Sequence, residues 1–170
     1  AGQPEVAMTA TVVTALKRDT WRANDVPMPV VTPVNAATKD RRDGAPVWFD
    51  RYDMRFVHGM SPAQSDGREA NSLTQLWMRD EPPRPLDFAS LTAMADVFYP
   101  RIWLRRAKRV AAGTVSMTTY FHASQAQLSD VGTGYLLGQA QAQAFRHGFF
   151  DQTAQLWSED GTLLATSTQL

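Results

Sequence analysis

The chain has 170 residues, of which 44% are hydrophobic and 20% charged, which is typical of one globular domain and excludes a disordered or collagen-like chain. Seventeen basic and seventeen acidic residues cancel, so no basic excess points to nucleic acid or to an anionic membrane. The absence of cysteine excludes disulfides, iron–sulfur clusters and cysteine nucleophiles. Because there is no apolar run of bilayer length and no signal peptide, we expect a soluble, cytoplasmic protein.

The N-terminal part divides into a strand-like segment and a proline-rich connection. Residues 5–16 are rich in β-branched side chains and predict a strand, whereas the prolines and charges between residues 24 and 46 predict a linker. A lone strand cannot bury its faces, so this one requires a sheet whose other strands lie elsewhere. We therefore assign residues 1–20 to a preceding repeat, residues 21–46 to an inter-repeat linker and residues 47–170 to a domain.

The domain begins with two predicted strands and a helix. Residues 47–57 alternate in polarity as a strand does, and residues 72–78 predict a second strand. Residues 86–98 are helix formers that end before Pro100. Since this short segment is apolar on nearly all sides, we expect a buried helix.

The rest of the chain predicts strands, over residues 114–121, 135–145, 149–158 and 162–170. The last two are joined by Asp160 and Gly161, and Asp-Gly between hydrophobic runs is a strong hairpin signal. One buried helix wrapped by an antiparallel sheet is α+β architecture, and this order of elements is that of the hotdog fold.

Four segments resemble the C-terminal half of the acyl-CoA thioesterase II (TesB-like) family: residues 94–96 (MAD), 113–122 (GTVSMTTYFH), 148–152 (GFFDQ) and 156–169 (LWSEDGTLLATSTQ). The resemblance extends from about Trp48 to the end, and the Asp-Gly hairpin with its late glutamine is its most specific part. The opening strand and the proline-rich linker resemble the end of that family's first hotdog repeat and the connection to its second. The resemblance implies half of a double hotdog, with the other half upstream or on another chain.

The resemblance implies that the protein is a hydrolase of fatty-acid metabolism. Members of the family cleave acyl-CoA thioesters without a metal or a covalent intermediate, and an Asp, a Thr and a Gln hold the attacking water. Carried over by motif, these residues are Asp96, Thr114 and Gln169, and no cofactor is implied. The family's hotdogs pair into one curved sheet, so we expect pairing with a second hotdog and a homo-oligomer.

The residues themselves allow this role and also simpler ones. Asp96 is the only acid between residues 88 and 98, and burial would raise its pKa toward that of a useful general base. It could instead be solvated at the end of the helix or pair with Arg101. Thr114 could be an ordinary strand residue, and Gln169 an ordinary surface residue.

The sequence contains other candidate polar groups and leaves other functions open. Asp151 and Gln152 could also lie near the site, and the cations Arg101, Arg105, Arg106, Lys108 and Arg109 form either a solvated loop or a patch that steers CoA phosphates. A dehydratase needs an Asp–His pair, which the sequence does not place at Asp96, and no Gly-x-Ser-x-Gly motif supports a serine nucleophile. The alternative from another class is a non-catalytic hotdog that binds acyl-CoA or only assembles with partners.

Overall fold

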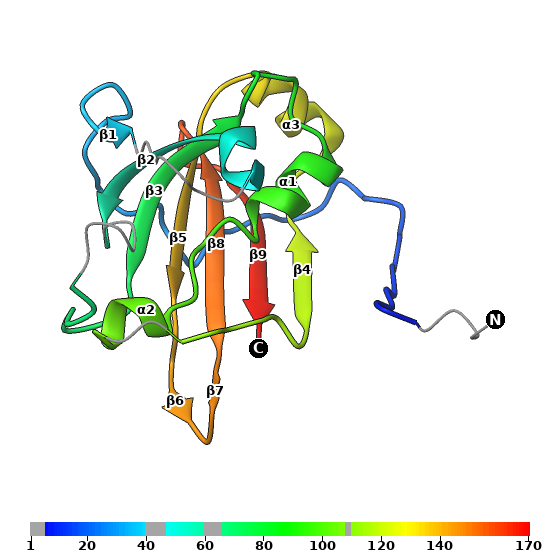
Figure 1. Cartoon of the computed structure of the whole chain (residues 1–170). Helices are drawn as coiled ribbons and strands as arrows, with labels where there is room; N and C mark the ends of the chain where they lie inside the picture. Colours follow the sequence, from blue (N-terminus) through cyan, green and yellow to red (C-terminus); the bar gives the residue numbers. More distant parts are fainter. Residues whose placement is uncertain (1–5, 40–46, 60–65, 108–109) are drawn as a thin grey trace.

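The computed structural model describes residues 6–39, 47–59, 66–107 and 110–170. Its elements, in chain order (Figure 1), are β1 (Thr38–Lys39), the 3-10 helix η1 (Val47–Arg51), β2 (Tyr52–His58), β3 (Thr74–Asp80), α1 (Phe88–Met94), α2 (Ile102–Arg105), β4 (Met117–Phe121), α3 (Gln125–Val131), β5 (Leu136–Gln141), β6 (Phe145–Arg146), β7 (Phe149–Phe150), β8 (Gln152–Ser158) and β9 (Leu163–Gln169). In this part of the chain no helix is long and apolar enough to cross a membrane.

The strands form one curved antiparallel sheet. Its order is β1-β2-β3-β5-β8-β9-β4, and the short hairpin of β6 and β7 extends beyond β5 and β8 (Figure 1). The side chains on the inner face of the sheet pack with α1 in a single hydrophobic core. An antiparallel sheet curved around one helix is the hotdog fold, which confirms the architecture predicted from the sequence.

The central helix is positioned by a cap and by buried apolar side chains. Asp87 is the N-cap of α1, because its carboxylate accepts a hydrogen bond from the backbone N–H of Ser90 at 2.7 Å. Leu91 and Met94 then face the sheet and are 0% and 2% exposed. The opposite side of the helix, including Thr92, is exposed. The expectation of a helix buried on all sides is therefore wrong for this chain, in which the sheet covers one face of α1.

Gly138 of β5 leaves room for two side chains of the core, Met78 and Phe98. A Cβ atom at this position would lie 2.4 Å from Cε of Met78 and 2.8 Å from Cζ of Phe98. Both distances are far below a normal carbon–carbon contact of about 3.5–4.0 Å. The glycine therefore lets the core close around Phe98, two residues beyond Asp96.

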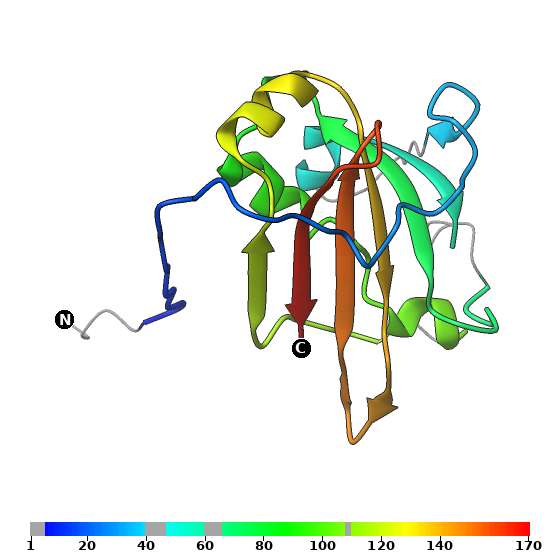
Figure 2. The same ribbon diagram turned by 180° about the vertical axis from the view of Figure 1, so that it is seen from behind.

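The outer face of the sheet is covered by part of the predicted linker. Trp77, Leu137 and Trp157 form a second apolar cluster on this face, and the side chains that cover it come from Met28, Val31, Val34 and Ala37. The indole N–H of Trp77 also donates to the carbonyl of Thr32 at 2.8 Å. Figure 2 shows this segment crossing in front of β9, β8 and β5. Residues 28–39 of the predicted linker thus pack on the domain and contribute β1, and the role of residues 21–46 as an inter-repeat connection stays a prediction.

Residues 6–23 have no regular secondary structure and are exposed. Val13 and Leu16 are 90% and 93% exposed, and Lys17 contacts the body of the domain through the backbone carbonyl of Ala123. No described strand pairs with residues 6–16, so the strand expected over residues 5–16 is not formed in the part of it that the structure describes. Its membership of a preceding repeat remains a prediction.

Several predicted elements begin or end at different residues. The first half of the strand expected over 47–57 is the helical turn η1, in which Phe49 is buried and stacks on Tyr99 with 6.1 Å between ring centroids. Polarity alternation alone cannot distinguish such a turn from a strand. The helix expected over 86–98 ends at Met94, and the strand expected from residue 114 begins at Met117.

Two helices were not predicted from the sequence. Helix α3 begins with a capping box, in which Ser124 and Gln127 bond each other's backbone N–H groups, and this Ser-x-x-Gln pattern was a readable signal. Helix α2 lies in the basic run that was interpreted as a loop. The cation that precedes it, Arg101, is 0% exposed and bonds the carbonyls of Tyr99 and Ser72. Burial lowers its pKa to about 9, which still leaves it charged at neutral pH.

Candidate functional site

The candidate site lies where β9 ends, close to the C-terminus marked in Figure 1. Gln169 is the last residue of β9, and its cross-strand partners are Gln152 of β8 and Met117 of β4. Because directly opposed residues of an antiparallel sheet project to the same face, Gln152 and Gln169 lie side by side on the inner face that packs against α1. Register alone therefore places two glutamine amides together at this end of the sheet.

Thr114 reaches the same place from a turn that precedes β4. Both Val115 and Ser116 donate backbone hydrogen bonds to the carbonyl of Leu170, at 2.6 and 3.2 Å. Leu170 in turn donates to the carbonyl of Ser116 at 3.0 Å. These bonds continue the pairing of β4 with β9, and they hold the Thr114 hydroxyl next to the Gln169 amide.

Asp96 reaches the site from the opposite direction, two residues beyond the end of α1. Its neighbours Ala95 and Val97 are buried, and its own N–H donates to the carbonyl of Ala93 at 3.1 Å. The side chain is exposed, but the protein around the carboxylate removes part of its hydration, and this desolvation raises the pKa of Asp96. The hydrogen bond from Gln169 acts in the opposite direction and lowers it.

The three residues singled out in the sequence are joined by one amide group. The Gln169 Nε2 group donates to Oδ1 of Asp96 at 2.8 Å and also to the Thr114 hydroxyl oxygen. A primary amide has two N–H bonds, so both are used. No described residue bonds the second carboxylate oxygen of Asp96, and the O–H of Thr114 remains able to donate. The arrangement thus offers one basic oxygen and one hydroxyl to a small polar molecule between them.

Neither of the two alternative pairings of Asp96, with Arg101 or with a histidine, is formed among the described residues. Arg101 does not pair with Asp96, since its guanidinium is buried against Tyr99, Ser72 and Thr74. The His122 ring bonds the Thr166 hydroxyl at 3.1 Å, and the Asp96 carboxylate bonds Gln169, so the hydrogen bonds of the described residues join no histidine to Asp96. Among the residues that the structure describes, no cluster of three or more potential metal ligands occurs.

The two further polar residues have separate roles. Gln152 is 4% exposed and donates to Oε1 of Gln169 at 2.8 Å, so it belongs to the site. Asp151 instead accepts hydrogen bonds from the backbone N–H groups of Gln143 and Ala144, and it therefore shapes the hairpin. In the basic run, Arg105 bonds the carbonyl of Ala70, while Lys108 and Arg109 lie outside the described residues.

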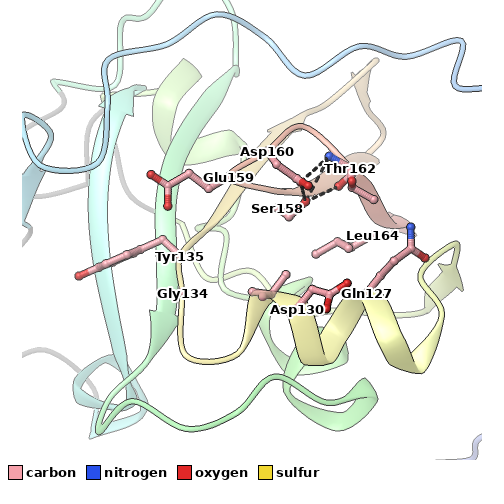
Figure 3. A pocket seen from close by; sticks show the side chains of 10 residues that line it. Gln127, Asp130, Gly134, Tyr135, Ser158, Glu159, Asp160, Thr162 and Leu164 are labelled. Carbon is pink, nitrogen blue, oxygen red and sulfur yellow. Dashed lines mark hydrogen bonds between the residues drawn. The ribbon is translucent and has the colours of Figure 1, made fainter.

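A cavity of about 250 Å³ lies elsewhere, between α3 and the turn that joins β8 to β9. Its lining, shown in Figure 3, comprises Gln127, Asp130, Val131, Gly134, Tyr135, Ser158, Glu159, Asp160, Thr162 and Leu164. Leu164 and Gln169 are five residues apart on β9, so the cavity and the site are separated by about 16 Å. The Ser158 hydroxyl donates to Asp160, which shows that these groups stabilise the turn. We therefore do not assign the chemistry to this cavity.

The fold and this hydrogen-bonded cluster define a hotdog protein with a polar site at one end of its sheet. Residues 28–170 match the acyl-CoA thioesterase C-terminal domain family, and the chain belongs to this family. No curated protein matches the chain.

Solved structures give the same fold. A conserved protein of unknown function with a hotdog fold from Alicyclobacillus acidocaldarius is 41% identical, with a TM-score of 0.81, and the match covers 90% of this chain and 56% of that one. A putative thioesterase from Novosphingobium aromaticivorans is 22% identical, with a TM-score of 0.69 and coverage of 90% and 56%. A putative thioesterase II from Thermobifida fusca is 19% identical, with a TM-score of 0.71 and coverage of 91% and 58%. The chain thus spans little more than half the length of the proteins it matches.

Proposed function

We propose that this protein hydrolyses acyl-CoA thioesters to a free fatty acid and CoA, and that Asp96, Thr114 and Gln169 hold the attacking water. The observation that carries the proposal is the Gln169 amide, which bonds Asp96 and Thr114 at once. Membership of the thioesterase family supports the reaction class. The raised pKa of Asp96 supports its use as a base, since a stronger base accepts a proton from water more readily.

The reaction needs one base and one water. The free oxygen of Asp96 accepts a proton from water while the water oxygen forms a bond to the thioester carbonyl carbon. Collapse of the tetrahedral intermediate breaks the carbon–sulfur bond, and the electron pair leaves with the CoA sulfur. The proton on Asp96 is returned to that thiolate or to solvent. Thr114 orients the water, and Gln169 keeps Asp96 and Thr114 at a constant separation.

This function is tested by incubating the purified protein with a medium-chain acyl-CoA and a reagent that reports free thiols. We expect release of one free thiol for each thioester consumed, at a rate proportional to protein concentration. Tight binding of acyl-CoA without release of CoA would instead identify a binding module. A protein that neither binds nor cleaves a series of acyl chain lengths would contradict both functions.

We further propose that the domain pairs with a second hotdog, from an upstream repeat or another chain, along β4. Among the strands that the structure describes, β4 lies at an edge of the sheet and pairs with β9 alone. Tyr120 and Phe121 of β4 are 60% and 39% exposed, and the uncovered side of α1 is also exposed. An open edge with aromatic side chains favours pairing with another strand.

Pairing predicts that the 170-residue chain sediments as a dimer or a larger assembly and not as a monomer. A charge placed on the edge by Tyr120→Glu should shift this equilibrium toward the monomer. The matched control is Phe149→Glu, which alters an aromatic of β7 that is 56% exposed and lies away from this edge. A stable monomer of the unaltered chain at micromolar concentration would contradict the pairing.

A further inference from the structure

The orientation of the Gln169 amide decides whether the site can work. The two ends of a glutamine amide have similar shapes but opposite polarity, so the group can be turned by 180° at little steric cost. In the observed orientation its NH₂ group faces Asp96 and Thr114. In the opposite orientation its carbonyl oxygen would face the Asp96 carboxylate, which only accepts hydrogen bonds when ionised.

The carbonyl oxygen of the Gln169 amide accepts a hydrogen bond from a buried glutamine, Gln152. Gln152 lies directly across from Gln169, and its Nε2 group donates to Oε1 of Gln169 at 2.8 Å. The Gln152 side chain is 4% exposed, so water cannot easily replace this donor. Turning the Gln169 amide would bring two NH₂ groups together at Gln152 and two oxygens together at Asp96. Both contacts therefore favour the same orientation.

We propose that Gln152 is a positioning residue, which fixes the orientation of the Gln169 amide so that its NH₂ group holds Asp96 and Thr114. The inference rests on the proposed function for its catalytic consequence. Gln152 does not touch the reacting atoms and acts only through Gln169. Without its N–H donor, only Asp96 and Thr114 orient the Gln169 amide, so the opposite orientation becomes more populated and Asp96 loses part of a hydrogen bond that lowers its pKa.

Two substitutions at Gln152 test this role. Gln152→Met keeps the approximate volume and removes the donor, and loss of one hydrogen bond should lower kcat about 3–10-fold with KM nearly unchanged. Gln152→Glu replaces the donor with an acceptor and should turn the Gln169 amide, so kcat should fall further, by about 100-fold. In both variants the acid limb of the kcat–pH profile should move to higher pH, because the pKa of Asp96 rises.

The matched control is Gln155→Met, on the same strand three residues away and on the outer face, where Gln155 accepts a hydrogen bond from Gln139. It should leave kcat and the pH profile unchanged. A double-mutant cycle separates positioning from general stability: in a Gln169→Met background, Gln152→Met should cause no further loss of kcat. Thermal unfolding of each variant identifies any that do not fold. If one of the two Gln152 variants does not fold, the other one tests the positioning role.

The pKa of Asp96 gives a readout that does not depend on turnover. We expect ¹³C NMR titration of the Asp96 carboxyl to show a higher pKa in Gln152→Met and Gln152→Glu, and no change in Gln155→Met. Folded Gln152 variants with an unchanged Asp96 pKa and unchanged kcat would overturn the positioning role and leave the proposed hydrolysis intact. If the unaltered protein cleaves no thioester, the proposed function fails, and the titration still decides the role of Gln152.

Discussion

Replacing Asp96 with asparagine should lower kcat for acyl-CoA hydrolysis at least about 100-fold, because asparagine cannot accept a proton from water and general-base catalysis contributes about 10²–10⁴-fold. The amide preserves the shape of the side chain, and its oxygen can still accept the hydrogen bond from Gln169. Binding should therefore survive, and KM should change little. The measurement is steady-state release of CoA with the thiol reagent.

The control for this prediction is Asp50→Asn, which neutralises another exposed aspartate, on η1, and should leave kcat within about twofold. In the unaltered protein only ionised Asp96 acts as the base, so activity should fall as the pH drops through its pKa. Desolvation raises that pKa, and we therefore expect the acid limb at a higher pH than a fully solvated aspartate would give. A loss of less than about 100-fold in Asp96→Asn would reject Asp96 as the base.

Replacing Leu91 with alanine should lower the free energy of unfolding by about 2–5 kcal/mol, the range observed when a buried leucine is truncated. Leu91 is 0% exposed and lies in the middle of α1, whose inner face is held mainly by Ser90, Leu91 and Met94. The helix has only seven residues and cannot be stable alone, so its position depends on this packing. Urea-induced unfolding followed by circular dichroism measures the change.

The neighbouring residue supplies a control for Leu91. Thr92 is exposed on the opposite side of the helix, and Thr92→Ala should change the free energy of unfolding by about 0.5 kcal/mol or less. A loss below about 1 kcal/mol for Leu91→Ala would mean that α1 does not depend on packing against the sheet. Because α1 leads directly into Asp96, the same variant should also show lower kcat at temperatures where it remains folded.

The local sequence was sufficient to predict those structural features that depend only on residues close together in the chain. The Asp160-Gly161 turn formed as predicted, with φ of +90° at Gly161, a conformation that glycine adopts without strain. The order of the predicted elements indicated the hotdog fold, because one short apolar helix and a set of alternating strands can bury their apolar faces in only a few arrangements. The positions of Asp96, Thr114 and Gln169 came from the resemblance, because no local pattern relates residues so far apart in the chain.

Local patterns were insufficient to predict the structure where the same polarity pattern or composition fits two different structures. Alternation before Tyr52 fitted a strand, but burial of Phe49 against Tyr99 requires a helical turn there. Prolines predicted a linker without regular structure, and only the folded chain shows that residues 28–37 of it cover Trp77 and its neighbours on the outer face. Arg101 was one of several cations in the sequence, and only the folded chain shows that its charge is buried.

The sequence by itself determined the fold class, the sharp turns and the residue types available for chemistry, since these depend on side-chain periodicity and local backbone preference. The tertiary structure alone decided that the Gln169 amide bridges Asp96 and Thr114 and that Gln152 supports it from β8. The physical reason is strand register: which residues of β8, β9 and β4 stand opposite each other is set by pairing between distant segments. A shift of one residue would turn these side chains to the other face of the sheet.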